Sequence, residues 1–426
     1  MIVETFNTVV NSVLLNLGGS LLITIVLFIL GLCFGAGFKK SFRGGLYAGF
    51  GLTCLNMMTG FLTTAMGPTV QGLSEMLGRT SQIQDVGWGV AGLAFSWPGA
   101  AFTIIAVMVV NVILILIKAA KTMWTDIWSF WHGQVVGCFV WAMTGNLFLG
   151  ILAATIFLTI GTFLGDATCK EYQEYNKMPG ISISCCYAVF GLIAKPFNWI
   201  FDRIPGFNKI DVSPDTIRDK VGVFGDQGVM GAIIGFIIGV VVWIGGKGSI
   251  FAALNLAVNV GVFMVFLPKA IGVLCEGVIP IANAVVNLVH EKFSGKRDIW
   301  VAIDCGALMG SPAVLASAVI LYPLVVLISV FLPGNMLLPI ASLAVIPAQC
   351  GAVAPFFKGN ILRMVVFVLI LNIPLLYLAS SMAPVQTAAM AAMQMGDPNV
   401  LNSSLDMGGD PLGFVIVNAF KLLTGK

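Results

Sequence analysis

Residues 85–100 read DVGWGVAGLAFSWPGA, residues 298–313 read DIWVAIDCGALMGSPA, and the expected architecture follows from this pair. Each stretch begins with an aspartate, is rich in small residues, has Ser and Pro near its end and precedes a strongly apolar run. Both are too short and too interrupted to cross a bilayer simply, because a transmembrane helix needs about 20 apolar residues. Interrupted segments at corresponding places in two halves of a chain are typical of transporters built from inverted repeats. We therefore predict two re-entrant helical hairpins, one in each half of the chain.

The composition indicates a membrane protein. The residues AVILMFWYC make up 58% of the chain and DEKR only 10%, and the mean hydropathy is +0.99; soluble globular proteins have about 45–50% apolar and 25% charged residues. The net charge of +3 is spread over short loops, which argues against a basic nucleic-acid-binding face. The nine cysteines lack the spacing of a metal site, and motifs for a zinc protease, a nucleophile elbow or a phosphate loop are absent from the sequence. We expect no metal and no cofactor.

Apolar runs long enough to span recur along the whole chain. Backbone polar groups inside lipid must be satisfied within their own segment, so these runs are expected to be helices. The sequence thus predicts an all-α polytopic membrane protein with about 10–11 transmembrane helices. The expected spans are 18–36, 44–64, 98–118, 134–164, 228–246, 249–267, 270–290, 312–332, 336–356 and 361–382, with a short amphipathic helix at 412–424.

Internal similarity supports a division into two repeats. Residues 29–61 and 237–266 each show an apolar helix pattern, a short turn with Gly and Lys, and a second helix pattern rich in small residues. Between the halves, residues 166–220 hold seven acids and seven bases, and the bases indicate a cytoplasmic location by the positive-inside rule. The predicted parts are a first inverted repeat, a polar cytoplasmic linker, a second inverted repeat and a C-terminal tail, over residues 1–165, 166–222, 223–385 and 386–426.

Polar residues within apolar stretches are the candidates for a site, because ionisable groups at membrane depth are costly and tend to mark substrate paths. The stretch WTDIWSFWHGQVVG, residues 124–137, contains His132 and Gln134, which can both donate and accept hydrogen bonds to hydroxyls. The alternative for His132 is a location at the membrane surface beside a tryptophan belt. Asp226 and Gln227 precede an apolar run, where Asp226 is either part of a site or a helix cap.

Three further acids have the same two interpretations. Asp304 lies inside the second interrupted stretch and Asp85 begins the first, and each can belong to a site or cap a helix. Glu276 lies within an apolar run, where a buried carboxylate needs a partner or a proton. An ion-coupled secondary transporter, with Asp85, Asp226 and Asp304 binding Na⁺ or H⁺, is consistent with these residues.

The chain as a whole resembles the membrane component, enzyme IIC, of the sugar phosphotransferase system, within the ascorbate–galactitol superfamily and nearest to galactitol-type permeases. The stretches that carry the resemblance keep their order over nearly the whole chain to about residue 385. They are DVGW at 85–88, DIWSFWHG at 126–133, FGDQGVMGAIIG at 224–235, FSGKRDIWVAID at 293–304, GSPAVLASAVILYP at 310–323, LPGNMLLPIASLAVIP at 332–347 and PFFKGNILR at 355–363.

The resemblance implies a homodimeric elevator-type transporter in the bacterial inner membrane. Such a protein moves a sugar or polyol and presents it to the phosphocysteine of enzyme IIB, which enzyme IIA supplies with phosphate. The permease itself is expected to hold no phosphate covalently and to have no catalytic residue of its own.

Carried over by position, the family's substrate-binding elements fall on His132, on Asp226 with Gln227, and on Asp304. Gly60 and the helix with Glu276 are weaker candidates. Ascorbate-type members have His-Gln where this chain has Asp226-Gln227, and the acid suits a neutral polyol better than an anion. Ser311 precedes Pro312 where galactitol-type members tend to have His, so the identity of the polyol stays open.

Overall fold

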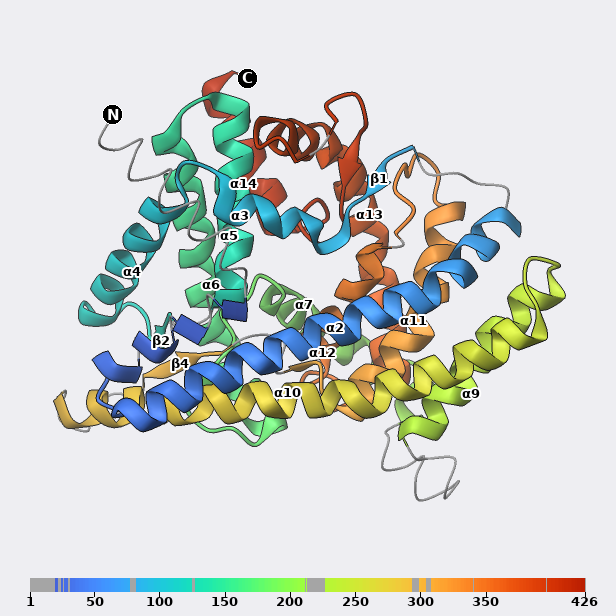
Figure 1. Cartoon of the computed structure of the whole chain (residues 1–426), viewed down its shortest axis with the longest axis horizontal. Helices are drawn as coiled ribbons and strands as arrows, with labels where there is room; N and C mark the ends of the chain where they lie inside the picture. The colour runs from blue at the N-terminus through green and yellow to red at the C-terminus, as the bar shows by residue number, and fades with distance from the viewer. Residues whose placement is uncertain are drawn as a thin grey trace.

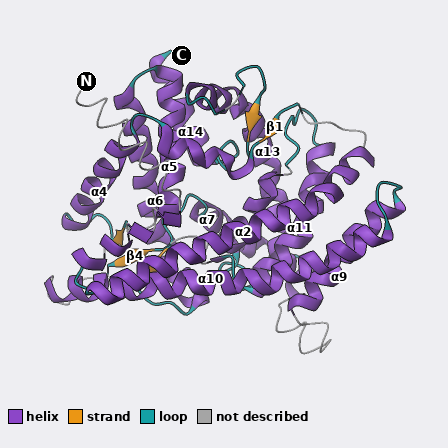
Figure 2. Ribbon diagram, viewed as in Figure 1, coloured by secondary structure: helices purple, strands orange, loops and turns teal. Residues whose placement is uncertain are grey.

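The computed structural model describes residues 20–425, apart from 22–23, 26, 30, 77–81, 125–126, 211, 213–226, 293–298, 304–307, 340 and 396. In this described part, helices joined by loops make up most of the chain, and the strands are very short (Figure 2). A helical segment within 20–33 comes first. The elements that follow are α2 (Phe38–Met76), β1 (Gln84–Asp85), η1 (Gly87–Gly92), α3 (Leu93–Ser96), α4 (Ala100–Leu116), β2 (Thr122–Met123), α5 (Ile127–Thr144), α6 (Leu147–Asn176), β3 (Ile181–Ser182), α7 (Ala188–Phe201), η2 (Phe207–Lys209), α9 (Gln227–Ile244), α10 (Ile250–Lys292), β4 (Trp300–Ala302), α11 (Pro312–Phe331), η5 (Ala341–Val345), α12 (Ile346–Val353), α13 (Ile361–Ala392), β5 (Asn402–Ser403) and α14 (Pro411–Thr424).

Apolar helices of spanning length are present, as the composition predicts. Among the described residues, α6, α11 and α13 are long and apolar enough to cross a membrane, and they carry the predicted spans 312–332 and 361–382. The other apolar helices in this part of the chain are shorter or broken by uncertain residues. The finding establishes a mostly helical membrane protein, and it identifies fewer clear spans than the ten expected from apolar runs.

Four predicted spans have different boundaries in the structure. The run 134–164 is two helices, because Gly145 has φ +71° and Asn146 caps α6 by accepting the backbone N–H bonds of Phe148 and Leu149. The runs 249–267 and 270–290 form the single helix α10, where the exposed Lys269 places its ammonium 4.9 Å from the centroid of the Phe266 ring. The run 336–356 is a loop followed by η5 and α12.

The two long helices α2 and α10 lie side by side across the molecule (Figure 1). They are antiparallel, since Gly44 near the start of α2 meets Gly277 near the end of α10, while Glu75 at the end of α2 lies 3.4 Å from Lys247 just before α10. Their backbones approach closely: a Cβ on Gly277 would lie 2.3 Å from the backbone nitrogen of Ala48. Small residues at such crossings allow close helix packing, as the glycine-rich pattern predicts.

Two small parallel sheets connect the halves of the chain in a reciprocal way. β1 pairs with β5, and Ile83 just before β1 bridges to Leu337. β4 lies between β2 and β3. β1, which follows α2, therefore pairs with segments from the C-terminal part of the chain, and β4, which follows α10, lies between β2 and β3 from the N-terminal part.

Helices α6 and α13 share contacts at equivalent positions. Each begins after a capping asparagine, Asn146 or Asn360, whose side chain accepts backbone N–H bonds from the first turn. Asp166 on α6 and Ser380 on α13 lie the same number of residues after the starts of their helices. Asp166 accepts backbone N–H bonds at the start of β2, and Ser380 accepts one immediately before the Leu337 bridge.

A third contact repeats about two turns further along the same helices. Gln173 and Thr387 again stand at equal distances from the starts of α6 and α13. Gln173 donates to the carbonyl of Ile181 at 2.8 Å, and Thr387 donates to the carbonyl of Asn402 at 3.5 Å. Ile181 and Asn402 are the first residues of β3 and β5, so each helix holds the strand that follows it by the same kind of bond.

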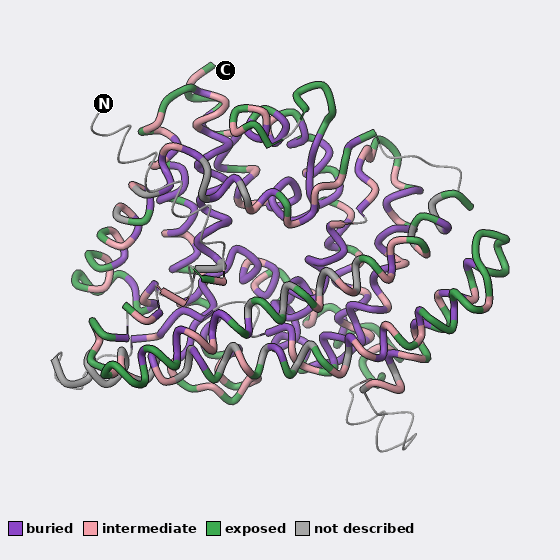
Figure 3. Tube along the Cα trace, viewed as in Figure 1, coloured by how far each residue is buried: buried purple, intermediate pink, exposed green. Residues whose placement is uncertain are grey.

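The core gathers around α5, α6, α11, α12 and α13, while much of α4, α9 and α10 is exposed (Figure 3). The expected linker, residues 166–222, contains the end of α6, β3 and α7, and α7 packs against α6, α12 and α13. The first interrupted stretch forms η1 and α3, then turns at Trp97 into α4. Val90, Leu93 and Trp97 in it are fully buried, which suits irregular backbone that must be covered by protein.

Candidate functional site

Helix α5 carries two of the predicted site residues into the core. Its residues from Ser129 to Val140 are all buried, because α5 packs against α3, α6, α13 and α14. Gln134 uses both ends of its amide: Oε1 accepts from Trp97 Nε1 at 2.8 Å, and Nε2 donates to the carbonyl of Ala100 at 2.8 Å. Gln134 therefore ties α5 to the turn before α4, and this paired amide has a structural role.

His132 meets a carboxylate from the far end of the chain. Its Nε2 lies 3.2 Å from Oδ1 of Asp406, and the two side chains are 0% and 1% exposed. The Tyr187 hydroxyl donates to the same oxygen. Burial, together with the Asp406 charge, raises the pKa of the Tyr187 phenol, so the hydroxyl stays protonated and remains a donor.

Aromatic rings fix the orientation of the imidazole. The Trp131 ring lies 3.9 Å from the His132 ring, centroid to centroid, and the Tyr187 ring meets it edge-on at 5.6 Å. The alternative that His132 lies at an exposed membrane surface is not what the structure shows, because the side chain is fully buried.

The loop that supplies Asp406 is buried along its whole length. Residues 402–410, NSSLDMGGD, run between α13 and α14, and all of them are buried. Ser403 donates to the carbonyl of Ala379 at 2.7 Å, and Ser404 accepts from the backbone of Met407 at 3.2 Å. A Cβ on Gly409 would lie 2.3 Å from the carbonyl oxygen of Leu405, so only glycine fits this turn.

Asp85 reaches the same loop through one serine. Its carboxylate accepts the backbone N–H of Ser342 at 2.8 Å and of Gly87 at 3.0 Å, and it also accepts the Ser342 hydroxyl. The Ser342 hydroxyl in turn accepts the backbone N–H of Leu405 at 2.8 Å. The structure therefore brings Asp85, through Ser342, and His132 to two adjacent residues of one C-terminal loop, Leu405 and Asp406.

The loop ends in a second buried acid. Asp410 caps α14, accepting the backbone N–H groups of Leu412 at 3.2 Å and Gly413 at 3.1 Å. Burial raises the pKa of the Asp410 carboxyl from 3.8 to about 7, although the His132 charge and the two backbone bonds act in the opposite direction, while Asp406 raises it further.

The other predicted site residues lie elsewhere or outside the described residues. Ser311 caps α11 by accepting from Val314 at 3.3 Å, and its hydroxyl lies 3.4 Å from that of Tyr175. Glu276 is exposed and lies 3.6 Å from Arg43, so it is a surface pair.

Four candidates are left without a described side-chain environment. Gly60 is within α2, and Gln227 begins α9. Asp226 and Asp304 are among the residues that the structure does not describe. The predicted grouping of His132 with Gln227 and Asp304 therefore stays a prediction.

Asp406, Tyr187 and Asp410 were not among the residues predicted from the sequence. The signal for two of them is in the chain: the stretch SSLDMGGD places two acids among Ser and Gly, close to an apolar helix. The prediction that residues 386–426 form a C-terminal tail left Asp406 and Asp410 out of the candidate site. Among the described residues, no group of three or more His, Cys, Asp or Glu side chains is arranged to hold a metal ion.

Known proteins resemble this chain over nearly its full length. Residues 13–399 match the family model EIIC-GAT, described as the PTS system sugar-specific permease component. The galactitol-specific EIIC component of the PTS system of Escherichia coli strain K12 is 28% identical over 409 residues, covering 96% of this chain and 90% of the relative. A putative permease IIC component of the same strain is 27% identical over 373 residues, covering 87% of this chain and 84% of the relative.

Proposed function

Because the chain belongs to the sugar-specific permease components of the phosphotransferase system, we propose that it transports a neutral sugar alcohol such as galactitol across the bacterial inner membrane. The galactitol-specific relative supports this substrate class. In the proposed reaction the permease presents the polyol to the phosphocysteine of enzyme IIB, and enzyme IIA supplies the phosphate. The polyol then leaves on the cytoplasmic side as its phosphate ester.

The observation that carries the proposal is the buried group of His132, Asp406 and Tyr187. A polyol has many hydroxyls and no charge, and each buried hydroxyl without a partner costs about 1–3 kcal/mol. A site for it needs side chains that both donate and accept, and an imidazole, a carboxylate and a phenol supply them. Positioning one hydroxyl in line with the phosphocysteine is the main catalytic requirement, so no strong base is needed.

The proposal includes an architecture of two inverted repeats that move as an elevator. Its support is the reciprocal pairing of β1 and β4 and the equivalent contacts at the starts and ends of α6 and α13. Under this proposal 1–165 and 223–385 are the repeats, 166–222 joins them on the cytoplasmic side, and the first interrupted stretch is a re-entrant hairpin. Alternating access would be a rigid movement of the substrate-binding part against α2 and α10.

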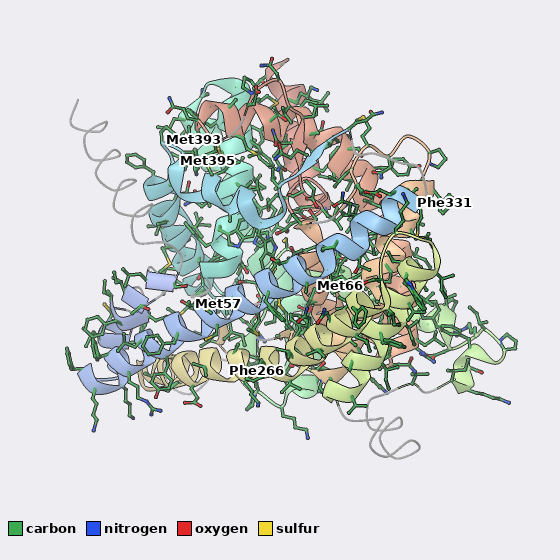
Figure 4. All side chains as sticks on the ribbon, turned by 45° about the vertical axis from the view of Figure 1, so that its right-hand side comes forward. Met57, Met66, Phe266, Phe331, Met393 and Met395 are labelled. Carbon is green, nitrogen blue, oxygen red and sulfur yellow. The ribbon has the colours of Figure 1, made fainter. Side chains whose placement is uncertain are left out.

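A multi-pass homodimer completes the proposal. Large apolar side chains are exposed on α2, α10 and α11, including Met57, Phe266 and Phe331, which are 62%, 49% and 64% exposed (Figure 4). Such faces suit lipid and a second subunit, because they cannot stay in contact with water. The molecular mass of the purified protein in detergent, corrected for bound detergent, tests the dimer.

The function is tested by uptake and phosphorylation together. Proteoliposomes with the permease, enzymes IIA and IIB, the phosphocarrier protein and phosphoenolpyruvate should accumulate galactitol phosphate, and an uncoupler should not prevent it. Accumulation of unmodified galactitol that collapses with the uncoupler would instead establish the ion-coupled transporter. A panel of hexitols and pentitols in the same assay identifies the preferred polyol.

A further inference from the structure

Two buried polar side chains, Asp406 of the His132 group and Gln386, have polar atoms without a hydrogen-bond partner among the described residues. Asp406 is 2% exposed and Gln386, on α13, is 0% exposed. Oδ1 of Asp406 accepts from His132 and Tyr187, whereas its Oδ2 atom has no hydrogen-bond partner among the described residues. Both amide atoms of Gln386 are also without a partner in this part of the chain.

Gln386 and Asp406 border the same short loop. A Cβ placed on Gly408, two residues after Asp406, would lie 3.3 Å from Oε1 of Gln386. The same point lies 2.3 Å from the hydroxyl of Ser403. Gly408 therefore packs closely against Ser403, and the Gln386 amide meets the loop two residues from Asp406.

The unpaired atoms of Asp406 and Gln386 require a physical explanation. A buried donor or acceptor without a partner costs about 1–3 kcal/mol, and native proteins have few of them. Gln134 and Gln349 on neighbouring helices show the usual outcome: both polar atoms of the Gln134 amide have a partner, and Oε1 of Gln349 accepts from Asn372 at 2.8 Å. Gln386 departs from this pattern, and it meets the loop whose Asp406 carboxylate also has one oxygen without a partner among the described residues.

We propose that Asp406 and Gln386 form a hydroxyl-binding subsite for the transported sugar alcohol. This inference rests on the proposed function and assigns part of its site to the C-terminal loop. One substrate hydroxyl donates to Oδ2 of Asp406. A second hydroxyl accepts from Nε2 of Gln386 and donates to its Oε1, using the two-way capacity of hydroxyl and amide.

The subsite also explains how substrate and product can be distinguished. A neutral polyol gains a charge-assisted bond at the Asp406 carboxylate, which is stronger than a bond between neutral groups. The phosphate ester brings negative charge toward that carboxylate, and like charges in a buried site oppose binding. The phosphorylated product should therefore bind more weakly than the polyol, which favours its release.

Two substitutions of nearly unchanged shape test the subsite. Asp406→Asn keeps an acceptor for Tyr187 but replaces the carboxylate, and Gln386→Met keeps the length of the side chain but removes the amide. The purified full-length protein is titrated with labelled galactitol and with a panel of other hexitols and pentitols, and its apparent melting temperature in detergent is recorded. Gln349→Met is the matched control, because it removes an amide that has a partner.

The expected result separates binding from folding. Gln386→Met should bind the polyol at least about tenfold more weakly while its melting temperature stays equal or rises, because no existing bond is lost. Asp406→Asn should weaken binding by about 10–100-fold. Asp406→Asn should also reduce the difference in affinity between the polyol and its phosphate ester, as measured by competition. A purely structural role of Asp406 would leave this difference in affinity unchanged. Gln349→Met should lower the melting temperature.

Wild-type affinity in both Asp406→Asn and Gln386→Met would overturn the subsite and leave the transport function standing. A lower melting temperature of Gln386→Met with unchanged affinity would overturn it as well, and would assign the amide to a bound water whose hydrogen bonds the substitution removes. If the wild-type protein binds none of the polyols, the proposed substrate class and the subsite both fail.

Discussion

The contact between His132 and Asp406 can be measured directly by a double-mutant cycle with His132→Ala, Asp406→Ala and the double variant. Removing one partner of a buried charged pair costs about 3–5 kcal/mol, because the other is left without compensation. Here Asp406 would keep only Tyr187 on Oδ1. Unfolding entropy of about 2.1 cal/mol/K per residue gives roughly 0.9 kcal/mol/K for this chain, so His132→Ala should lower the melting temperature by about 3–6 °C.

The double variant should be more stable than the sum of the two losses predicts. Once Asp406 is gone, the loss of His132 leaves no unpaired charge, so the coupling energy should be about 1.5–3 kcal/mol, or roughly 2–3 °C. The assay is the apparent melting temperature of the detergent-purified protein, with monodispersity checked by gel filtration. Additive losses within about 0.5 kcal/mol would refute the contact on which the site is built.

Three further results are expected. Gly277→Val should force α2 and α10 apart, because its Cβ would lie 2.3 Å from the nitrogen of Ala48, and should lower stability by about 1–3 kcal/mol; an unchanged melting temperature would contradict the crossing. Asp410→Asn keeps a capping oxygen but removes a carboxyl whose pKa burial raises from 3.8 to about 7. A raised pKa favours the protonated folded state, so wild-type stability should fall as pH rises from about 4 to 7 and then level off, and this fall should disappear in the variant. Glu276→Gln should leave galactitol binding unchanged, since the exposed pair with Arg43 contributes about 0–1 kcal/mol; weaker binding would return Glu276 to the site.

The sequence predicts the class and family of this protein well, because those depend on patterns spread along the chain. The resemblance to enzyme IIC is confirmed by the family match over residues 13–399. Helix boundaries were less predictable where a short turn signal lies within a long apolar run. The pair Gly145-Asn146 is an ordinary stop and start signal, and it divides an apolar run that otherwise looks like one span.

The surroundings of the candidate site residues were partly predictable for a different reason. His132 and Asp85 stand out because polar residues in apolar stretches are rare; His132 contacts the C-terminal loop directly, and Asp85 reaches it through Ser342. Gln134 stands out equally, yet both polar atoms of its amide already have structural partners, Trp97 and Ala100. Sequence reveals that a polar residue is costly to bury, and only its neighbours reveal whether that cost has already been offset.

By itself, the sequence determined that this chain is a helical membrane permease of the phosphotransferase type, since composition, apolar runs and motif order need no knowledge of contacts. Only the tertiary structure decided that a segment near the chain end completes the surroundings of His132. Asp406 is 274 positions away from His132 along the chain. No local pattern encodes a contact over such a separation; it arises because α5, α13 and α14 pack together, with β5 held beside β1.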